Sequence, residues 1–575
     1  MLQQYHETFL RIKFKLVYMG KLIGLGLGSQ ILFFFSAIFA LKLKLPHEQF
    51  LIVQAWIVTI IKNFFLGFFH KPLIEYDPAM VIHAIITVAK SVKLPFLISL
   101  SGWLIPYFMH KWLKNKDTKA LKEHQVAGSE IIPVLKFIKQ LRKKPSRLKI
   151  GGLQEGFSLL DEDKLAAKQN KKEENEFRKG IVPIPTESEL RHFFIVGRSG
   201  SGKTVLLNPT IQQLKIRQEK ILIHDFKGDM VTKFYNPITD FIFNPLDRRC
   251  LKWNIWNDIE DEIDIRSIAS SLFQTTIKED PFWNDAAKDI FEGILIYLYN
   301  QELKTNKAIY EYINKPAGEI LAILKNDPDT AVAARYISDP NSKQTQGVLS
   351  KLTQNTKCFK YLKDIDGDFS IKEWIEYKKD STIFLVNYAD IKDTIAPVLS
   401  VFVDIATRTT LSLQDDLNRR IFFFLDEFGQ LNKMNSLVDI LTNGRSKGAS
   451  IWLAIQDIGQ IDEKYGVNIR KTIVNAFSNY IVFAANDYDT AKFFVNKIGE
   501  RKVVVTDEML RHDSEAEDDN LGIRKTQKTE NLILASDVMN MRDREAFIKV
   551  SEIQQYSKIK VYLKPIANVV NRIER

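Results

Sequence analysis

Cysteine is nearly absent from this sequence. Its 575 residues include only Cys250 and Cys358, which stand far apart along the chain. Two distant thiols exclude a disulfide framework and a Cys-x-x-Cys metal pattern, and two buried thiols in a reducing compartment are the simplest interpretation. A disordered chain is also excluded, because 45% of the residues are hydrophobic and 26% are charged, as in globular proteins. The length leaves room for three or four domains.

The net charge of the chain is +11, but most of the chain has no excess of basic residues. Residues 1–150 hold 22 of the 81 Lys and Arg but only 7 of the 70 Asp and Glu, whereas residues 151–575 hold 59 basic and 63 acidic residues. A basic segment beside apolar runs indicates membrane topology and anionic lipid more than a DNA-coated surface. Any DNA path in the larger part is therefore expected to be a local channel lining.

One long uncharged run predicts a membrane anchor. Residues 22–41 (LIGLGLGSQILFFFSAIFAL) contain no charge, and a helix of this length covers about 30 Å, the thickness of the hydrocarbon core. A cleavable signal peptide is the alternative, but the run is longer than a usual signal core and no small-x-small cleavage site follows it. A second span is expected at about residues 94–110, where interfacial aromatics extend a shorter apolar run.

The distribution of lysine and arginine agrees with two spans. Basic residues precede the first span and follow the second, so both ends should be cytoplasmic and the number of spans even. Residues 51–69 are apolar but carry Lys62, and a mid-span lysine costs about 3 kcal/mol on insertion, which disfavours a third crossing. We therefore expect a membrane domain over residues 1–112 and a basic juxtamembrane stem over 113–180.

A phosphate-binding loop follows the stem. Residues 192–204 read HFFIVGRSGSGKT, in which the apolar run Phe193–Val196 predicts a buried strand and leads into the complete G-x-x-x-x-G-K-[ST] pattern. Helical periodicity follows over Val205–Arg217, although Pro209 lies inside it. Strand, glycine-rich loop and helix are the context that this motif requires, so we predict a site for the phosphates of ATP.

The expected nucleotide-binding residues are Gly197, Arg198, Ser199, Gly200, Ser201, Gly202, Lys203, Thr204 and Val205. Glycines let successive N–H groups converge on the phosphates, and the helix N-terminus adds partial positive charge. Lys203 would reach the β- and γ-phosphates, and the Thr204 hydroxyl would bind Mg²⁺.

The second half of the expected site lies far downstream. Ile421–Leu425 (IFFFL) predicts another buried strand, which ends at Asp426 and Glu427. Paired with a phosphate-binding loop, this acidic pair predicts a Mg²⁺ site: Asp426 would hold the ion and Glu427 would position and deprotonate the attacking water. Two further strands, Ile221–Ile223 and Ile451–Ile455, favour an α/β P-loop (RecA-like) fold with a doubly wound, mostly parallel sheet.

Two polar residues near the last of these strands have alternative interpretations. Gln456 either senses the γ-phosphate and orients water, or caps the end of its strand. Arg445, in the turn Asn443-Gly444-Arg445, is either an arginine finger for a neighbouring subunit's nucleotide or a solvated surface residue. Position alone leaves both pairs open. His224, a lone imidazole at a strand end, is expected to be structural.

Beyond these motifs, several longer segments follow in a distinctive order. They are the two expected spans, HFFIVGRSGSGKT, IHDFKGDM, FNPLDRRCLKWNIW (Phe243–Trp256), KEDPFW (Lys278–Trp283), FLDEFGQLNKM (Phe424–Met434), NGRSKGASIWLAIQDIGQIDEKYG (Asn443–Gly466) and a closing strand near Ala546–Val550. Together they resemble the TraD/TrwB-type coupling proteins of conjugative and type IV secretion systems, within the FtsK–HerA class of translocases. The resemblance covers nearly the whole chain and is closest to the TraD branch.

The resemblance implies a role for each site residue. Lys203 and Thr204 look like the family's P-loop pair, Asp426 and Glu427 its acidic pair, Arg445 its arginine before the glutamine strand, and Gln456 that glutamine. Lys203, Glu427, Arg445 and Gln456 then form the catalytic set, with ATP and Mg²⁺ as cofactors. The resemblance further implies a homo-hexameric ring around a central channel, in which Arg445 acts in trans.

The resemblance also implies an ATP-hydrolysing DNA translocase in the bacterial inner (cell) membrane, with a cytoplasmic motor domain. Its implied partners are DNA, single-stranded with an attached relaxase, together with secretion-channel components, relaxosome proteins and the lipid bilayer. The motor is expected over residues 181–260 and 369–575, with an all-α inserted domain over 261–368. Longer TraD proteins dock the relaxosome through an extended C-terminal tail, whereas this sequence ends at Arg575, which leaves relaxosome recognition open.

Other functions share parts of this pattern. A membrane-anchored, ATP-switched docking receptor for protein effectors has the same motifs, and stimulation of ATP hydrolysis by DNA separates it from a motor. An FtsK-like chromosome pump normally adds a long linker and a winged-helix tail, and this sequence shows neither. An ABC ATPase is disfavoured because no LSGGQ-type signature occurs.

Overall fold

A computed structural model describes residue 54 and residues 124–150, 181–274, 280–377, 381–388, 392–511, 520–563 and 565–574. The two predicted spans and nearly all of segment 51–69 fall outside these residues, so the membrane domain stays a prediction. The chain divides into two compact units, residues 1–124 with 503–528, and residues 125–502 with 529–575.

Two long strands were not anticipated from the sequence. β11 (Glu500–Arg511) and β12 (Asn520–Asn531) form a three-stranded sheet with β1 (His124–Gly128), in the order β1-β11-β12. A separate two-stranded sheet pairs β2 (Ser146–Ile150) with β3 (Val182–Pro185) in antiparallel fashion.

The second unit is built on a nine-stranded sheet in the order β14-β13-β10-β4-β9-β8-β5-β7-β6. Its strands are β4 (Phe193–Val196), β5 (Lys220–Asp225), β6 (Phe241–Phe243), β7 (Thr382–Val386), β8 (Ile421–Leu425), β9 (Ala449–Ile455), β10 (Asn479–Val482), β13 (Glu545–Lys549) and β14 (Ser557–Lys560). Neighbours from β10 to β6 are parallel, while β13 pairs antiparallel with β10 and β14. The expected mostly parallel α/β sheet is confirmed, with an antiparallel edge added.

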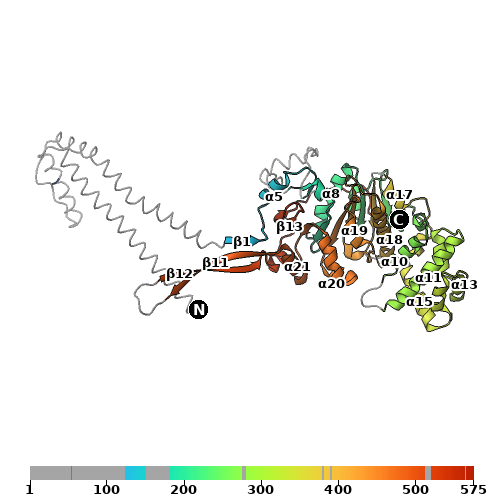
Figure 1. Cartoon of the computed structure of the whole chain (residues 1–575). Helices are drawn as coiled ribbons and strands as arrows, with labels where there is room; N and C mark the ends of the chain where they lie inside the picture. Colours follow the sequence, from blue (N-terminus) through green and yellow to red (C-terminus); the bar gives the residue numbers. More distant parts are fainter. Residues whose placement is uncertain are drawn as a thin grey trace, which may run out of the picture. The chain divides into compact units, whose positions relative to one another are not determined.

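Helices cover both faces of this sheet, which is why its strands are apolar on both sides. Along β4, Phe193 and Ile195 join one hydrophobic cluster, and Phe194 and Val196 join another, as the alternation of side chains in a strand requires. One face packs against α5 (Val134–Leu141), α8 (Lys203–Ile216) and α9 (Asp229–Phe234); the other packs against α10 (Glu262–Leu272), α18 (Lys392–Ser412), α19 (Leu437–Asn443), α20 (Gly459–Ala476), α21 (Tyr488–Ile498) and α22 (Ala535–Met539) (Figure 1).

Helices fill the chain between β6 and β7. After a short 3₁₀ helix (Ile255–Asp258) and α10 come α11 (Pro281–Asn300), α12 (Asn306–Ile313), α13 (Ala317–Lys325), α14 (Ala331–Ala334), the 3₁₀ helix Arg335–Ile337, α15 (Lys343–Asn355), α16 (Phe359–Leu362) and α17 (Ile371–Glu376). Asp280 accepts a hydrogen bond from Phe282 N–H and Pro281 occupies the first helical position, so the DPF sequence starts α11. The limits of the all-α domain, 261–368, stay a prediction.

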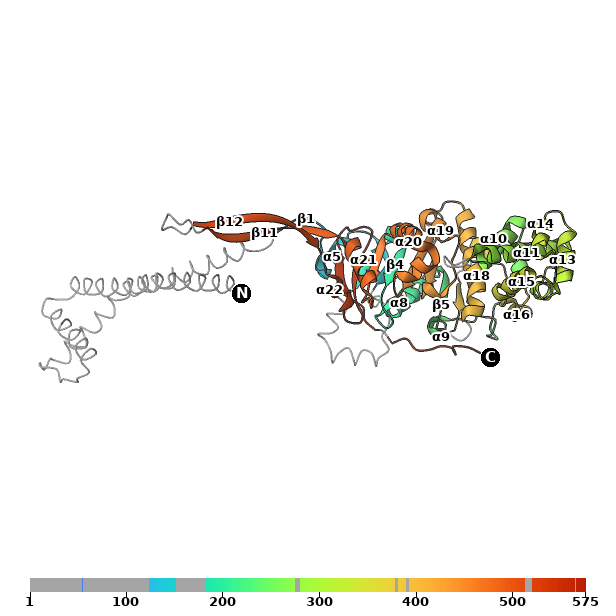
Figure 2. The same ribbon diagram turned by 90° about the horizontal axis from the view of Figure 1, so that it is seen from below.

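The last described segment runs across the second unit. Val569 N–H donates to Thr232 O (2.7 Å) and Arg248 N–H donates to Glu574 O (2.8 Å), so residues 565–574 lie against α9 and the NPLDRR loop (Figure 2). The Tyr388 hydroxyl adds a hydrogen bond to Arg572 O (2.8 Å).

Among the described residues, only α18 is long and apolar enough, by length and composition, to cross a membrane. Most of it is buried: 78% of its most apolar window lies inside the protein. Ile395, Leu399 and Phe402 are among its buried side chains. These features fit a core helix of the second unit.

His192, which precedes β4, is expected to make the fold sensitive to acid. Its side chain is 2% exposed, its Nδ1 accepts from Ile451 N–H (3.0 Å), and burial lowers its pKa to about 4. An unfolded histidine titrates near 6.5, so the unfolded state binds more protons between these values and stability falls as pH drops through that window. From pH 8 to pH 5 we expect a loss of about 2 kcal/mol from this group.

Thermal unfolding at pH 5 and pH 8 tests this expectation with His192→Asn. Asparagine does not titrate and tolerates the left-handed backbone (φ +47°) at this position. The variant should lose less stability on acidification than the wild type, and an equal loss in both proteins would contradict the assignment.

Candidate functional site

The glycine-rich loop joins β4 to α8 in a conformation that glycine makes possible. Gly200 and Gly202 have φ angles of +78° and +119°, which residues with a side chain rarely adopt. At its start the loop is fastened to the sheet, because Gly197 N–H donates to the last carbonyl of β9 (3.2 Å) and Arg198 N–H donates to a carbonyl beyond β10 (2.7 Å). The backbone therefore wraps over the carboxyl edge of β4 and enters α8.

Lys203 begins α8 with its ammonium folded back over this loop. Nζ donates to Gly197 O (2.5 Å) and Arg198 O (3.3 Å), and the residue is 5% exposed. Burial lowers the pKa of Lys203, while the charges of Glu427 and Asp426 raise it. A buried cation at the N-terminus of a helix, inside a glycine loop, suits a phosphate group.

The other predicted loop residues differ in exposure. Ser201 and Gly202 are buried, Arg198, Thr204 and Val205 are half-buried, and Ser199 and Gly200 are exposed. The open side of the loop is therefore accessible to a ligand, while its base is fixed by packing.

The strand register brings the acidic pair to the same edge of the sheet. Val196 at the end of β4 lies opposite Ile455 of β9, and Leu425 at the end of β8 lies opposite Leu453 of β9. Asp426 and Glu427 follow directly, and both interact electrostatically with Lys203. The two halves of the predicted site, distant in the sequence, are therefore close together.

Glu427 has an unusual backbone for a glutamate. Its φ and ψ are 49° and 53°, a left-handed conformation that costs about 1–3 kcal/mol and persists only where its surroundings hold it. Its side chain accepts a hydrogen bond from Gln456 Nε2 (2.8 Å). Gln456 therefore reaches the acidic pair, which favours the interpretation of a site residue over that of a strand cap.

Asp426 is buried at a position where its charge is unfavourable. Burial, Glu427 and Asp225 together raise its pKa to about 7, while Lys203 opposes the shift. Asp426 Oδ1 and Ser201 Oγ are buried and have no hydrogen-bond partner among the described residues. A buried carboxylate oxygen and a buried hydroxyl left without partners are suited to a ligand, and a cation beside Asp426 would favour its ionised form.

Two further residues lie beside the acidic pair. The sequence analysis assigned no role to Asp225, and it expected His224 to be structural. Asp225 ends β5 and accepts hydrogen bonds from three N–H groups at the start of α9. His224 Nδ1 is 2.7 Å from Asp426 O, and burial lowers its pKa to about 4, so it is neutral at physiological pH. Both side chains hold backbone in place, in agreement with a structural His224.

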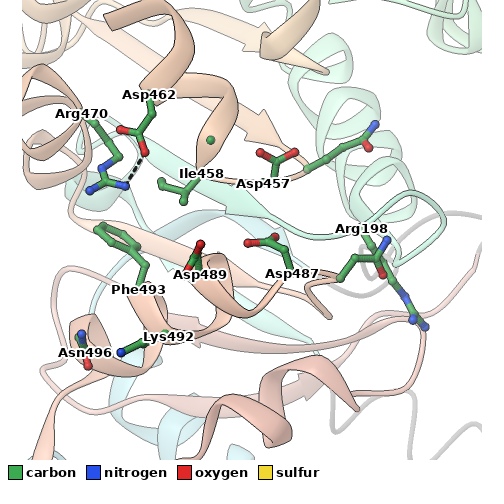
Figure 3. Close-up of a pocket in the computed structure, with 13 residues that line it drawn as sticks. Arg198, Asp457, Ile458, Asp462, Arg470, Asp487, Asp489, Lys492, Phe493 and Asn496 are labelled. Atoms are coloured by element: carbon green, nitrogen blue, oxygen red, sulfur yellow. Dashed lines mark hydrogen bonds and ion pairs between the residues drawn. The ribbon is translucent and has the colours of Figure 1, made fainter. Parts of the chain in front are cut away.

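A cleft of about 640 Å³ opens beside the loop, between α20 and α21. Asp457, Asp487 and Asp489 face into it, and Arg470 pairs with Asp462 on its wall at 2.8 Å (Figure 3). Because Arg198, Arg470 and Lys492 also line the cleft, its charge is close to balanced. The unpartnered Ser201 Oγ and the N-terminus of α8 instead favour the glycine loop as the place for phosphate groups.

Arg445 is not brought to this site. It is exposed and lies in the turn between α19 and β9, whereas Gln456 follows the other end of β9. The seven residues of β9 separate them by about 20 Å. Within one chain Arg445 is therefore distant from the glycine loop, a placement that fits either a role in trans or a solvated surface arginine.

Contacts from the C-terminal part of the chain were missed by the sequence analysis. Arg544 N–H donates to Ser201 O (2.7 Å), and Arg198 pairs with Asp543 (2.8 Å). The residues before β13 thus support the glycine loop. No local motif marks them, because their role depends on the antiparallel edge of the sheet.

The chain is thus an α/β protein in which a P-loop sequence motif lies at the carboxyl edge of a mostly parallel sheet. A family model described as the DNA-binding domain of type IV secretion-system coupling proteins matches residues 177–562. That match covers well over half of the chain, so the chain belongs to the family of type IV secretion-system coupling proteins.

Individual relatives agree with this family. The chain is 25% identical to the coupling protein TraD of Escherichia coli (strain K12) over 478 residues, which are 81% of this chain and 62% of that protein. The type IV secretion system-coupling protein VirD4 of Bartonella quintana (strain Toulouse) is 28% identical over 158 residues, 27% of this chain and 24% of that protein. The chain thus spans less than two thirds of these curated relatives.

Solved structures of the bacterial conjugative coupling protein TrwB share the fold. The unbound form superposes with a TM-score of 0.65 at 22% identity, covering 79% of this chain and 97% of that one. The complex of TrwB with the ATP analogue ADPNP gives a TM-score of 0.63, also at 22% identity, over 78% of this chain and 97% of that one.

Proposed function

We propose that this protein is an inner-membrane coupling protein that hydrolyses ATP to move DNA, with its attached relaxase, toward a type IV secretion channel. The observation that carries the proposal is the strand register, in which the ends of β4 and β8 lie on either side of β9 and bring the glycine loop at 197–204 to the same sheet edge as Asp426 and Glu427. Membership of the coupling-protein family supports the substrate and the location. The predicted spans supply the anchor.

The residues present fit ATP with Mg²⁺. Buried Asp426 Oδ1 and Ser201 Oγ are without partners among the described residues, and TrwB has been solved with ADPNP and with ADP and Mg²⁺. Bound Mg²⁺ would neutralise phosphate charge. Lys203 would bind the β- and γ-phosphates, and Thr204 and Asp426 would hold the metal ion.

Glu427 is placed to act as the general base. Its carboxylate accepts from Gln456, which would keep both side chains oriented toward a water in line with the γ-phosphate. Arg445, distant from the site of its own chain, would complete the site of the next subunit in a homo-hexameric ring and stabilise transition-state charge. Such a ring gives single-stranded DNA a central channel. Because the charge of residues 151–575 is nearly balanced, a DNA path confined to a channel lining is expected more than a broad basic surface.

A docking receptor that uses ATP as a switch for protein effectors is the second candidate. The full chain in detergent, assayed for ATP hydrolysis with and without single-stranded DNA, distinguishes the two. A motor should hydrolyse ATP severalfold faster with DNA, because translocation couples each turnover to the strand. A rate indifferent to DNA would favour the receptor, and Lys203→Ala measured in parallel reports contaminating ATPase.

A further inference from the structure

The segment that follows Glu427 is held in place from α20. A short 3₁₀ helix, Phe428–Gln430, comes directly after the acidic pair. Lys464 of α20 donates from Nζ to Gly429 O (2.7 Å) and to Leu431 O. Its ammonium also lies 6.0 Å from the centroid of the Phe428 ring. One half-buried cation therefore joins two carbonyls of the segment that leaves Glu427.

Two more side chains of α20 hold the same segment. The Tyr465 hydroxyl accepts from Met434 N–H (2.8 Å) and is 3.3 Å from Met434 O. Gln460 packs against Gly429 so closely that a Cβ atom added there would lie 2.6 Å from Gln460 Cδ. Residues 429–434 are thus attached to one helix at three points.

The same helix begins just after Gln456 and is interrupted beyond these contacts. Gly466 has φ 78° and ψ 159°, so the helical path breaks immediately after Tyr465. The contacts to residues 429–434 therefore come from the first half of α20. This half is also bound to the end of β9, because Gln456 N–H donates a hydrogen bond to Gln460 Oε1 (3.3 Å).

We propose that Lys464 is a positioning residue for Glu427. This inference rests on the proposed ATPase function. The left-handed backbone of Glu427 requires support from its surroundings, and the two carbonyls held by Lys464 lie two and four residues beyond it. Without the ammonium these carbonyls lose their donor, the segment relaxes, and the carboxylate leaves the position that Gln456 and the attacking water require.

The ammonium is charged under physiological conditions. Burial lowers the pKa of Lys464 to about 8, with Lys392 adding to the shift and Glu463 opposing it. Burial is the main reason why the pKa of His224 is low, and the charge of Lys464 adds a smaller contribution in the same direction. The carbonyl contacts are therefore made by a cation, and arginine is the replacement that keeps a positive donor at this position.

The test compares the full chain with Lys464→Met, Lys464→Arg and the matched control Lys471→Met. Lys471 is an exposed lysine of the same helix, beyond the break at Gly466. We measure kcat and KM for ATP, the affinity for ATP with Mg²⁺, and thermal unfolding. Lys464→Met should lower kcat by about tenfold or more and leave the ATP affinity within about twofold. Lys464→Arg should recover most of the rate, and Lys471→Met should match the wild type.

A wild-type kcat in Lys464→Met overturns the inference. The inference is also overturned if Lys464→Met loses rate because it binds ATP more weakly and Lys464→Arg does not recover the rate. Should Lys464→Met not fold, Gly429→Ala replaces it, because the added methyl group pushes the segment away from Gln460 with Lys464 intact. That variant should lose kcat, and the double variant with Gln460→Ala should regain it; unchanged kcat in Gly429→Ala overturns the inference. A wild-type chain without ATPase activity would instead refute the proposed function.

Discussion

Replacing Glu427 with glutamine is expected to lower ATP turnover by about 10²–10⁴-fold, the usual contribution of a general base. The amide cannot take a proton from water, yet it has nearly the same size and fits beside Gln456. Because Lys203 and the glycine loop are unchanged, ATP with Mg²⁺ should still bind with near wild-type affinity. Steady-state hydrolysis and nucleotide binding, measured on the same preparation, check both parts of this expectation.

Two comparisons sharpen this test. Glu376→Gln, which changes an exposed glutamate at the end of α17, should leave turnover unchanged. Lys203→Ala should abolish turnover through lost phosphate binding, so its affinity for ATP should fall as well. Wild-type turnover in Glu427→Gln would show that Glu427 is not the general base. Weaker ATP binding without a loss of kcat would show that Glu427 contributes to binding instead.

Replacing Arg445 with alanine is expected to reduce ATP turnover by about 10³-fold or more, the effect of an arginine finger. The loss should occur although Arg445 is exposed and lies at the opposite end of β9 from Gln456. A surface arginine that is only solvated would have no effect on hydrolysis. The rate of the full chain under conditions in which it assembles decides between these alternatives.

Mixed assemblies show whether Arg445 acts in trans. In a ring of Arg445→Ala and Lys203→Ala subunits, some sites combine an intact glycine loop from one chain with an intact arginine from the next, so part of the activity should return. A mixture of Lys203→Ala with Glu427→Gln should stay inactive, because both residues belong to the same half of the site. If Arg445→Ala alone is impaired and its mixture with Lys203→Ala subunits stays inactive, Arg445 acts within its own chain.

Much of this site could be predicted from the sequence because its strands are continuous apolar runs. Phe193–Val196 and Ile421–Leu425 are buried on both faces, and each is followed by a motif whose residue types fit only a few kinds of chemistry. Parallel strands place their carboxyl ends at one edge, so the meeting of Lys203 with Asp426 followed from the two strand predictions. The helix after the loop formed as expected and continues through Pro209.

Features that depend on long-range packing were not predictable in this way. The closing strand expected near Ala546–Val550 is present as β13 (Glu545–Lys549). Its antiparallel pairing, the strands β14, β11 and β12, and the support of the glycine loop by Arg544 have no local periodicity that points to their partners. The left-handed backbone of Glu427 likewise has no signal in the sequence, because it depends on tertiary surroundings: Gln456 donates to the Glu427 side chain, and we propose that Lys464 holds the segment that follows. Arg445 was assigned by resemblance, because no pattern within one chain indicates a contact with a neighbouring subunit.

The most direct test of this account is a Mg²⁺ titration of ATP binding to the full chain, compared with Asp426→Asn. The account holds that Asp426 and the glycine loop surround one metal-bound triphosphate. It predicts that Mg²⁺ strengthens ATP binding in the wild type, that Asp426→Asn needs at least about tenfold more Mg²⁺ for the same effect, and that Asp439→Asn, at an exposed position of α19, behaves as the wild type. An identical Mg²⁺ dependence in wild type and Asp426→Asn would contradict it.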